Sequence, residues 1–416
     1  MASPTAERPA VADLPTDPEE LARALVARAR ALRPQLIADE ADAERRTYYS
    51  AELDRAFEEA GFYRMYLPRR FGGLEVDVPT FVKTIIEVGR GSLAAAWCLC
   101  LTANHSLQVA SWFGERAQHE LLGGGTFRAA SVAAPTVRAT RVQGGYRLDG
   151  EVAYCSGIPY ATHFMGQAML APAGGGEPEM ALFVAPRSEY EQLGVWGRLA
   201  GLKGTGSDTI RFDGGFVPEH HVLERTSMVD FPADGGTAGL ALHGNPLYAG
   251  RALTIFTLSL AAPVVGGAYG ALDEYAEAMR TRMTALPPFR PRVEDADFQR
   301  HYGSALARIG VAEAAVVRGA ELHMENCRNG AAGTSPVTAA DDFRVAAIVR
   351  EACLHAWEAI EQDLLRTIGS SALTEGTRFE RAVRDFGQVA GHRNFALRDA
   401  MFRLTAAQHL GVEPVE

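Results

Sequence analysis

The sequence predicts an α+β protein in which a compact β-segment separates two helical regions. Apolar residues recur at three- and four-residue steps from residue 18 to about 122, and helical periodicity returns from about residue 248. Between them, short β-branched and aromatic runs are separated by glycines. Elements segregated in this order are typical of α+β folds rather than of alternating βαβ units. We expect a disordered tail (1–17), an N-terminal helical domain (18–125), a central β-barrel-like domain (126–240) and a C-terminal helical bundle (241–416).

The N-terminal region carries four helical patterns. The segments 18–46 and 51–67 are amphipathic, a turn follows at 67–75, and the apolar stretch 78–114 predicts two further helices. The residues before position 18 contain proline, alanine and acids but neither a basic start nor an apolar signal core. We therefore expect a cytoplasmic protein.

The middle of the chain shows hairpin signals. Gly144-Gly145 and Asp149-Gly150 interrupt a β-rich stretch over 128–170, and further strand patterns occupy 175–190, 190–204 and 209–223. Long helices follow, including the segment 251–283. The GGAYG stretch at 266–270 lies inside this helical segment instead of after a strand, which disfavours a dinucleotide-binding fingerprint.

Composition excludes several classes of function. The chain has 416 residues, of which 47% are hydrophobic and 22% charged, and no run of 18 apolar residues predicts a membrane span. A net charge of −10 argues against nucleic acid or an anionic membrane as the main partner. The five cysteines form no CxxC pair and the eleven histidines no HExxH motif, so we expect reduced thiols and no metal.

Two stretches of the β-segment carry a family resemblance. GGYRLDGEVAYCSG (144–157) and GLKGTGSDTIRFDGGFVPEHHVL (201–223) resemble the β-domain of the acyl-CoA dehydrogenase superfamily, and the similarity extends over roughly residues 20–410. The resemblance implies a small β-domain between an N-terminal helical domain and a C-terminal four-helix bundle. It also implies a flavin between the β-domain and that bundle.

Two departures distinguish the chain from acyl-CoA dehydrogenases. The first strand reads SVAAPTV instead of a TEPxxGSD-like stretch. The Glu-Gly-Thr that supplies the usual base does not follow the Arg-Asp of FERAVRDF, and the TEGT at 374–377 precedes it. The chain instead resembles the group D flavin monooxygenases, the oxygenase components of two-component systems, such as the p-hydroxyphenylacetate hydroxylase oxygenase.

This resemblance implies an activity and its partners. A separate NAD(P)H:flavin reductase would supply reduced flavin, FMNH2 or FADH2. The reduced flavin would react with O2 to give a C4a-hydroperoxyflavin, which would hydroxylate a small aromatic compound, with a phenol as the expected class. The subunits would form a homotetramer. Two alternatives stay open, which are oxygenation of an amino-sugar nitrogen or a thiophene sulfur by the same family, and an acyl-CoA dehydrogenase with an unusual base.

The resemblance also assigns roles to individual residues. His392, after ERAVRD, is the candidate for acting on the phenolic proton, because the pKa of histidine lies near working pH. Ser156 in YCSG is the candidate hydroxyl near flavin N5, and His105 in TANHS a second catalytic histidine. The ordinary alternatives are a solvated helix-end histidine, a turn-capping serine beside Gly157 and a core histidine.

Further residues are expected to contact the substrate or the cofactor. Ser131 and Trp97 are candidates for the substrate. Flavin binding would use Ser156, Ser131, Thr205, Ser207, Arg251 and the backbone of 131–135 and 154–157. Some of these residues also have an ordinary structural interpretation. Thr205 and Ser207 would then belong to a glycine-rich turn, Arg251 would be a surface residue and Trp97 a core residue.

Overall fold

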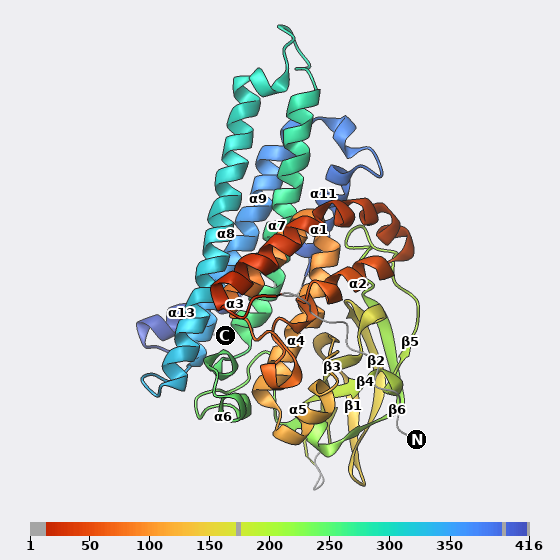
Figure 1. Cartoon of the computed structure of the whole chain (residues 1–416), viewed down its shortest axis with the longest axis vertical. Coiled ribbons are helices and arrows are strands. Elements are labelled where there is room, and N and C mark those ends of the chain that lie inside the picture. The colour runs from red at the N-terminus through yellow and green to blue at the C-terminus, as the bar shows by residue number, and fades with distance from the viewer. Residues whose placement is uncertain (1–13, 172–175, 393–396, 414–416) are drawn as a thin grey trace.

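The computed structural model describes residues 14–171, 176–392 and 397–413, so most of the expected N-terminal tail and residues 393–396 beside His392 lie outside it. Within this part the order of elements is helices, sheet, helices. In Figure 1 a tall bundle of helices occupies the upper part of the molecule and the sheet lies at the lower right, with the N-terminal helices between them.

The N-terminal helices follow the expected pattern. They are α1 (Pro18–Arg46), α2 (Ala51–Glu59), α3 (Val78–Gly91), α4 (Leu93–Trp112) and α5 (Glu115–Leu122). The first four have side-chain caps, because Asp17, Ser50, Asp77 and Ser92 each accept a hydrogen bond from a backbone N–H of the first turn. Helix α4 differs from the others in being buried on nearly all sides.

The sheet has seven strands in the order β5, β6, β2, β1, β3, β4, β7. They are β1 (Ala129–Val142), β2 (Gly145–Cys155), β3 (His163–Leu170), β4 (Glu179–Pro186), β5 (Glu191–Gln192), β6 (Asp208–Pro218) and β7 (Val222–Glu224). All neighbours are antiparallel except β1 and β3, which makes the sheet mixed. The sheet encloses its own apolar cluster, which includes Phe164, Phe183 and Phe212.

One expected hairpin is confirmed and the other is wrong. Gly144, with φ of +80°, forms the turn that joins β1 to β2, where Val142 pairs with Gly145. Asp149-Gly150 lies inside β2 instead, at a shift in the register with β6. Asp149 there accepts a hydrogen bond from the backbone N–H of Gly214 at 3.0 Å, so the pair makes a β-bulge and the strand continues.

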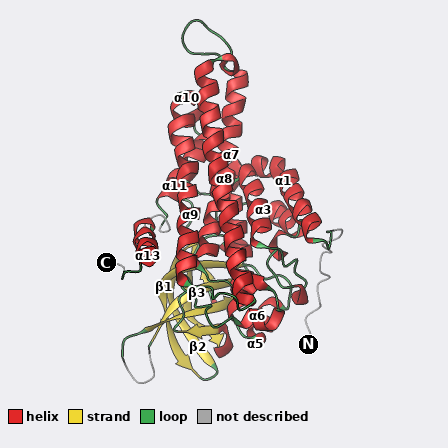
Figure 2. Cartoon of the chain, turned by 90° about the vertical axis from the view of Figure 1, so that its left-hand side faces the viewer, coloured by secondary structure: helices red, strands yellow, loops and turns green. Residues whose placement is uncertain are grey.

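The C-terminal region is helical. It contains α6 (Ala238–His243), α7 (Leu253–Thr281), α8 (Ala296–Ala331), α9 (Ala339–Glu358), α10 (Arg366–Ile368), α11 (Arg378–Ala390) and α13 (Arg398–Leu410), and a π-helical turn at Ala359–Leu365 joins α9 to α10. Figure 2 shows α7, α8 and α9 running side by side above the sheet. Among the described residues, only α7 is long and apolar enough to cross a membrane, but 89% of its most apolar window is buried inside the protein.

The glycines of GGAYG serve helix packing. A Cβ atom on Gly266 would come within 2.3 Å of the carbonyl oxygen of Ile86 and 2.7 Å of the Cα of Gly89. Helices α3 and α7 therefore approach until their backbones touch, which only glycine at this position permits. The contact fixes the C-terminal bundle against the N-terminal helices that carry the site described below.

We predict that Gly266→Ala destabilises the protein by about 1–3 kcal/mol, the usual cost of overpacking a core. Gly310→Ala is the matched control, because Gly310 also lies inside a helix but has no atom within 4 Å of its would-be Cβ. That control should stabilise the protein by about 0.5–1 kcal/mol through helix propensity. Urea unfolding measures both changes, and equal stability of the two variants would contradict the close contact.

Candidate active site

Helix α4 places a row of polar side chains in the interior. Thr102, Asn104, His105, Ser106, Gln108 and Ser111 are all buried, although they lie on a helix enclosed by apolar neighbours. Burying polar groups costs free energy unless hydrogen bonds satisfy them. Thr102 and Ser106 donate to carbonyl oxygens of the same helix, whereas His105 reaches the carbonyl oxygen of Ala129 on the sheet.

His105 has a hydrogen-bond partner on each ring nitrogen. Its Nδ1 lies 2.6 Å from the carbonyl oxygen of Ala129, and its Nε2 lies 2.8 Å from Ser131 Oγ. A carbonyl oxygen only accepts, so Nδ1 carries the proton and the neutral ring accepts at Nε2 from the Ser131 hydroxyl. Burial lowers the pKa of His105 to about 4, which keeps this neutral tautomer.

The orientation of Ser131 leaves its oxygen able to accept. Its single proton is directed to His105, so the lone pairs of Oγ remain open to a donor from a ligand. Met228, whose Sδ lies 3.9 Å from this oxygen, and Phe256, whose ring centroid lies 6.0 Å from that of His105, add apolar surface nearby. Neither Met228 nor Phe256 was predicted as a site residue, because single apolar residues in a sequence do not indicate a site.

Ser156 begins a chain of hydroxyl groups. Trp97 Nε1 donates to Ser156 Oγ at 3.3 Å, and Ser156 lies 2.7 Å from Ser207 Oγ, which lies 2.6 Å from Thr205 Oγ1. Thr205 donates its only proton to the carbonyl oxygen of Leu202 at 2.7 Å. Because each hydroxyl has one proton to donate, Ser156 donates its hydrogen bond to Ser207, and Ser207 donates to Thr205.

A buried acid on the C-terminal bundle binds Leu202, the residue at which the hydroxyl chain ends. Asp385 of α11 accepts a hydrogen bond from the backbone N–H of Leu202 at 2.6 Å. Burial raises the pKa of Asp385 to about 7, the Leu202 bond opposes this, and the charges of Glu40 and Glu44 raise it further. Asp385, which precedes His392 in the sequence, therefore connects α11 of the bundle to the hydroxyl chain.

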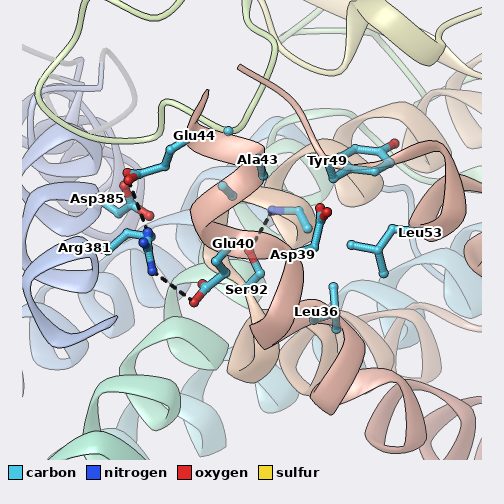
Figure 3. Close-up of a pocket in the computed structure, with 13 residues that line it drawn as sticks. Leu36, Asp39, Glu40, Ala43, Glu44, Tyr49, Leu53, Ser92, Arg381 and Asp385 are labelled. Atoms are coloured by element: carbon cyan, nitrogen blue, oxygen red, sulfur yellow. Dashed lines mark hydrogen bonds and ion pairs between the residues drawn. The ribbon is translucent and has the colours of Figure 1, made fainter. Parts of the chain in front are cut away.

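The hollow in Figure 3 lies beside this connection, because Asp385 also lines it. Arg381 points toward Glu40 and Glu44, at 3.6 and 3.3 Å, and Asp385 and Tyr49 also line the space. Its charged walls are closed by ion pairs. This suits a joint between α1, α4 and α11 better than a pocket for an aromatic compound.

His392 contacts the hydroxyl chain through Trp97, the donor to Ser156. Its ring contacts that of Trp97 edge to face, with centroids 5.4 Å apart, and its backbone N–H donates to Val389 at the end of α11. The side chain is exposed on one side. Protein packed on its other side and the positive charge of Arg350 lower the pKa of His392 to about 4. Arg393 and Asn394, which follow it, lie outside the described residues.

Two stretches of adjacent strands leave their backbone without a ladder partner among the described pairings. Residues 133–136 of β1 pair with neither β2 nor β3, and Ala153 and Tyr154 of β2 fall in a register gap with β6. Pro135 contributes by lacking an N–H. Tyr154 has a φ of +65° and a side chain that is 59% exposed. These stretches overlap the backbone segments that were expected to bind the flavin.

Arg251 lies elsewhere, in a pocket with Gln108 and His323. Its guanidinium is buried and bound to Asp230 at 2.7 Å and Asp234 at 3.2 Å. Two carboxylates thus already compensate its charge. Of the expected site residues, the structure brings Trp97, Ser156, Ser207, Thr205 and His392 into one connected set, and His105 with Ser131 into another.

Comparison with known proteins identifies relatives of this architecture. Residues 18–122 match the family model of the acyl-CoA dehydrogenase N-terminal domain, and residues 258–396 match that of the C-terminal domain. The structure superposes on XiaF from Streptomyces in complex with FADH2 and glycerol with a TM-score of 0.84, at 24% identity, over 96% of this chain and 98% of that one. The expected fold is confirmed.

Curated proteins align over part of the chain. The oxygenase subunit HsaA of a flavin-dependent monooxygenase from Rhodococcus jostii is 31% identical over 56% of this chain and 59% of its own length. The oxygenase component of an FADH2-dependent resorcinol hydroxylase from Rhizobium is 32% identical over 54% of each chain. The aligned segments thus span little more than half of these relatives.

We predict that Asp385→Asn changes the pH dependence of stability. An aspartate titrates near 3.9 when unfolded, and the folded pKa of Asp385 is about 7, so its contribution is lost as pH rises from about 4 to 7. The asparagine variant should therefore gain stability relative to the wild type over this range, by at most about 4 kcal/mol, and stay level above it. Urea unfolding at several pH values tests this, and a constant difference would contradict it.

Proposed function

The chain belongs to the acyl-CoA dehydrogenase superfamily, and we propose that it is the oxygenase component of a two-component flavin-dependent monooxygenase that hydroxylates a phenolic compound. The observation that carries the substrate class is the pair of buried His105 and half-buried Ser131, which presents a hydrogen-bond acceptor suited to a phenolic hydroxyl. The hydroxylases among the aligned relatives support the same class.

The site residues fit a flavin. Residues 133–136 and Ala153 lie outside the strand ladders and can offer backbone amides and carbonyls to the polar edge of the ring. The carbonyl oxygens of Ala133 and Tyr154 already accept from Gln167 Nε2 and from the N–H of Ser156. Ser156, oriented by Trp97 and Ser207, would place a hydroxyl beside the ring, and Thr205 would hold that arrangement. A reduced flavin, when bound, supplies the activation of oxygen. FMN and FAD both satisfy these contacts, and the FADH2-bound relative favours FAD.

His105 and Ser131 would prepare the substrate. A phenolic hydroxyl donates its proton to Ser131 Oγ, whose own proton is shared with His105 Nε2, while the Ala129 carbonyl holds the ring in place. This draws the phenolic proton partly from its oxygen and raises the electron density of the aromatic ring, so that its carbon is a better nucleophile. The acceptor is available only while His105 is neutral.

This proposal moves substrate activation from His392 to His105. His105 is fully buried and orients the Ser131 hydroxyl through Nε2, whereas the ring of His392 packs edge to face with that of Trp97. We propose that His392 positions Trp97, and through it Ser156. Substrate activation requires a site from which water is excluded, and this favours the buried His105 for that role.

We also propose the setting of the reaction. The relatives are named as oxygenase subunits and components, which supports a separate reductase as the source of reduced flavin. A cytoplasmic homotetramer fits the expected family properties, and exposed apolar side chains on the bundle, among them Leu306 and Val311 of α8, are available for contact between subunits.

We predict that Ser131→Ala lowers the rate of hydroxylation of a phenol by about 10²–10⁴-fold, the usual contribution of general acid and base groups. Oxygen use should continue, because the variant leaves the Ser156 chain intact. In the wild type the hydroxylation rate should stay level from pH 6 to 8 and fall only as pH approaches the pKa of His105, about 4. His409→Gln on α13 is a control that leaves the site untouched. An unchanged rate for Ser131→Ala would remove this pair from the mechanism.

Replacing Ser156 should affect the oxygen chemistry instead. Ser156→Ala removes the acceptor of the Trp97 N–H and the donor to Ser207. We expect more hydrogen peroxide released per oxygen consumed, with flavin affinity changed by only about 0.5–1.5 kcal/mol, the net worth of one hydrogen bond. Peroxide assay and flavin titration measure the two effects. Coupling equal to that of the wild type would return Ser156 to a turn-capping role.

The purified chain should not oxidise NADH by itself. No nicotinamide fingerprint follows a strand in this sequence, and GGAYG lies inside α7. We expect NADH consumption with added flavin only when a flavin reductase is present, as followed by absorbance at the nicotinamide band. Sustained turnover without a reductase would contradict the two-component assignment.

A further inference from the structure

Three potential metal ligands converge outside the site described above. Glu120 lies on α5, and His220 and His221 lie on the short turn between β6 and β7. His220 Nε2 is 2.6 Å from Glu120 Oε2, and His221 Nε2 is 3.2 Å from the same oxygen. One ligand atom from each residue lies within 4.8 Å of the other two. The cluster thus joins two segments that are 100 residues apart in the chain.

His221 is the unusual member of this cluster. Its side chain is only 6% exposed, yet neither ring nitrogen has a hydrogen-bond partner. The 3.2 Å approach to Glu120 is therefore close in distance but not aligned for a hydrogen bond. Buried polar groups are normally satisfied, so an unpartnered buried imidazole beside a carboxylate needs an explanation.

We propose that Glu120, His220 and His221 bind a divalent transition-metal ion of the zinc class. Two imidazoles and one carboxylate are donors that suit zinc, nickel or cobalt, and three protein ligands leave a further position for water. Glu120 is exposed, so solvent reaches that position. A metal ion would satisfy the buried nitrogen of His221 that the protein itself leaves without a partner.

The surroundings both help and oppose the ion. Arg116 Nε donates to the other oxygen of Glu120 at 3.1 Å, which orients the carboxylate, while its positive charge weakens the attraction for a cation. The rings of His220 and His221 lie against each other, with centroids 4.7 Å apart, so both imidazoles are held beside the carboxylate. The carboxylate of Glu120 supplies negative charge toward a divalent ion.

The expected absence of metal rested on local spacing motifs, which this arrangement lacks. Two of its ligands are adjacent in sequence, and the third comes from a distant helix. Bound metal would tie α5 to the turn between β6 and β7, and so would fasten the N-terminal helices to the sheet. This role is independent of the proposed oxygenase activity.

Titration of the full chain, freed of metal with a chelator, tests the proposal. We expect saturable binding of Zn²⁺ at one ion per chain, visible absorption bands with Co²⁺ in its place, and a higher Tm with Zn²⁺. Glu120→Gln and His221→Ala should each weaken binding at least about tenfold, the lower end of the effect of losing an orienting partner. Because Glu120 is exposed, its variant should fold even if that of His221 does not.

His119→Gln is the matched control, since His119 lies beside Glu120 on α5 but contacts Arg70 and Phe71 instead. It should bind Zn²⁺ as the wild type does. The proposal is overturned if the wild type shows no saturable binding, if binding survives in the Glu120 and His221 variants, or if His119→Gln weakens it equally.

Discussion

The hydrogen bond from His105 Nδ1 to the carbonyl oxygen of Ala129 is the contact on which the rest of the site depends. It joins a helix that is buried on nearly all sides to the first residue of β1. Because the carbonyl can only accept, it fixes the tautomer of His105, and the tautomer in turn fixes the direction of the Ser131 hydroxyl. One backbone oxygen thus determines which atom of the site can receive a proton.

A second connection runs from Ser156, the serine proposed to lie beside the flavin, to the C-terminal bundle. The hydrogen bonds of this hydroxyl chain all point in one direction, from Ser156 to Ser207, Thr205 and the carbonyl oxygen of Leu202. The N–H of Leu202 in turn donates to Asp385. Each hydroxyl in such a chain is oriented by the next, so the arrangement of Ser156 depends on groups beyond its immediate neighbours. This explains why residues on the sheet and on α11 belong to one site although nearly two hundred residues separate them.

Much of the fold could be predicted from the sequence because its signals are local. The periodicity of 18–46 and 251–283, and the Gly144-Gly145 turn, depend on neighbouring residues and were correctly interpreted. The hairpin predicted at Asp149-Gly150 was wrong because this dipeptide occurs in both turns and β-bulges, and pairing with the neighbouring strand β6 determines which one forms.

The chemistry of the site was harder to predict. His105 and Ser131 were both identified as candidates, but their hydrogen bond joins residues 26 positions apart that no spacing rule connects. The contact of His392 with Trp97, and the approach of His221 to Glu120, are likewise products of tertiary packing. Sequence patterns indicate which residue types are present, whereas burial and partners decide what each can do.

The most direct test is to supply the chain with enzymatically reduced flavin, ¹⁸O2 and a panel of phenols and thiophenes, and in parallel with oxidised flavin, an electron acceptor and acyl-CoA thioesters, and to analyse the products by mass spectrometry. The account predicts that one ¹⁸O atom enters the ring of a phenol. Desaturation of an acyl chain without ¹⁸O, or incorporation only at sulfur, would contradict the assignment of His105 and Ser131 to the activation of a phenolic hydroxyl.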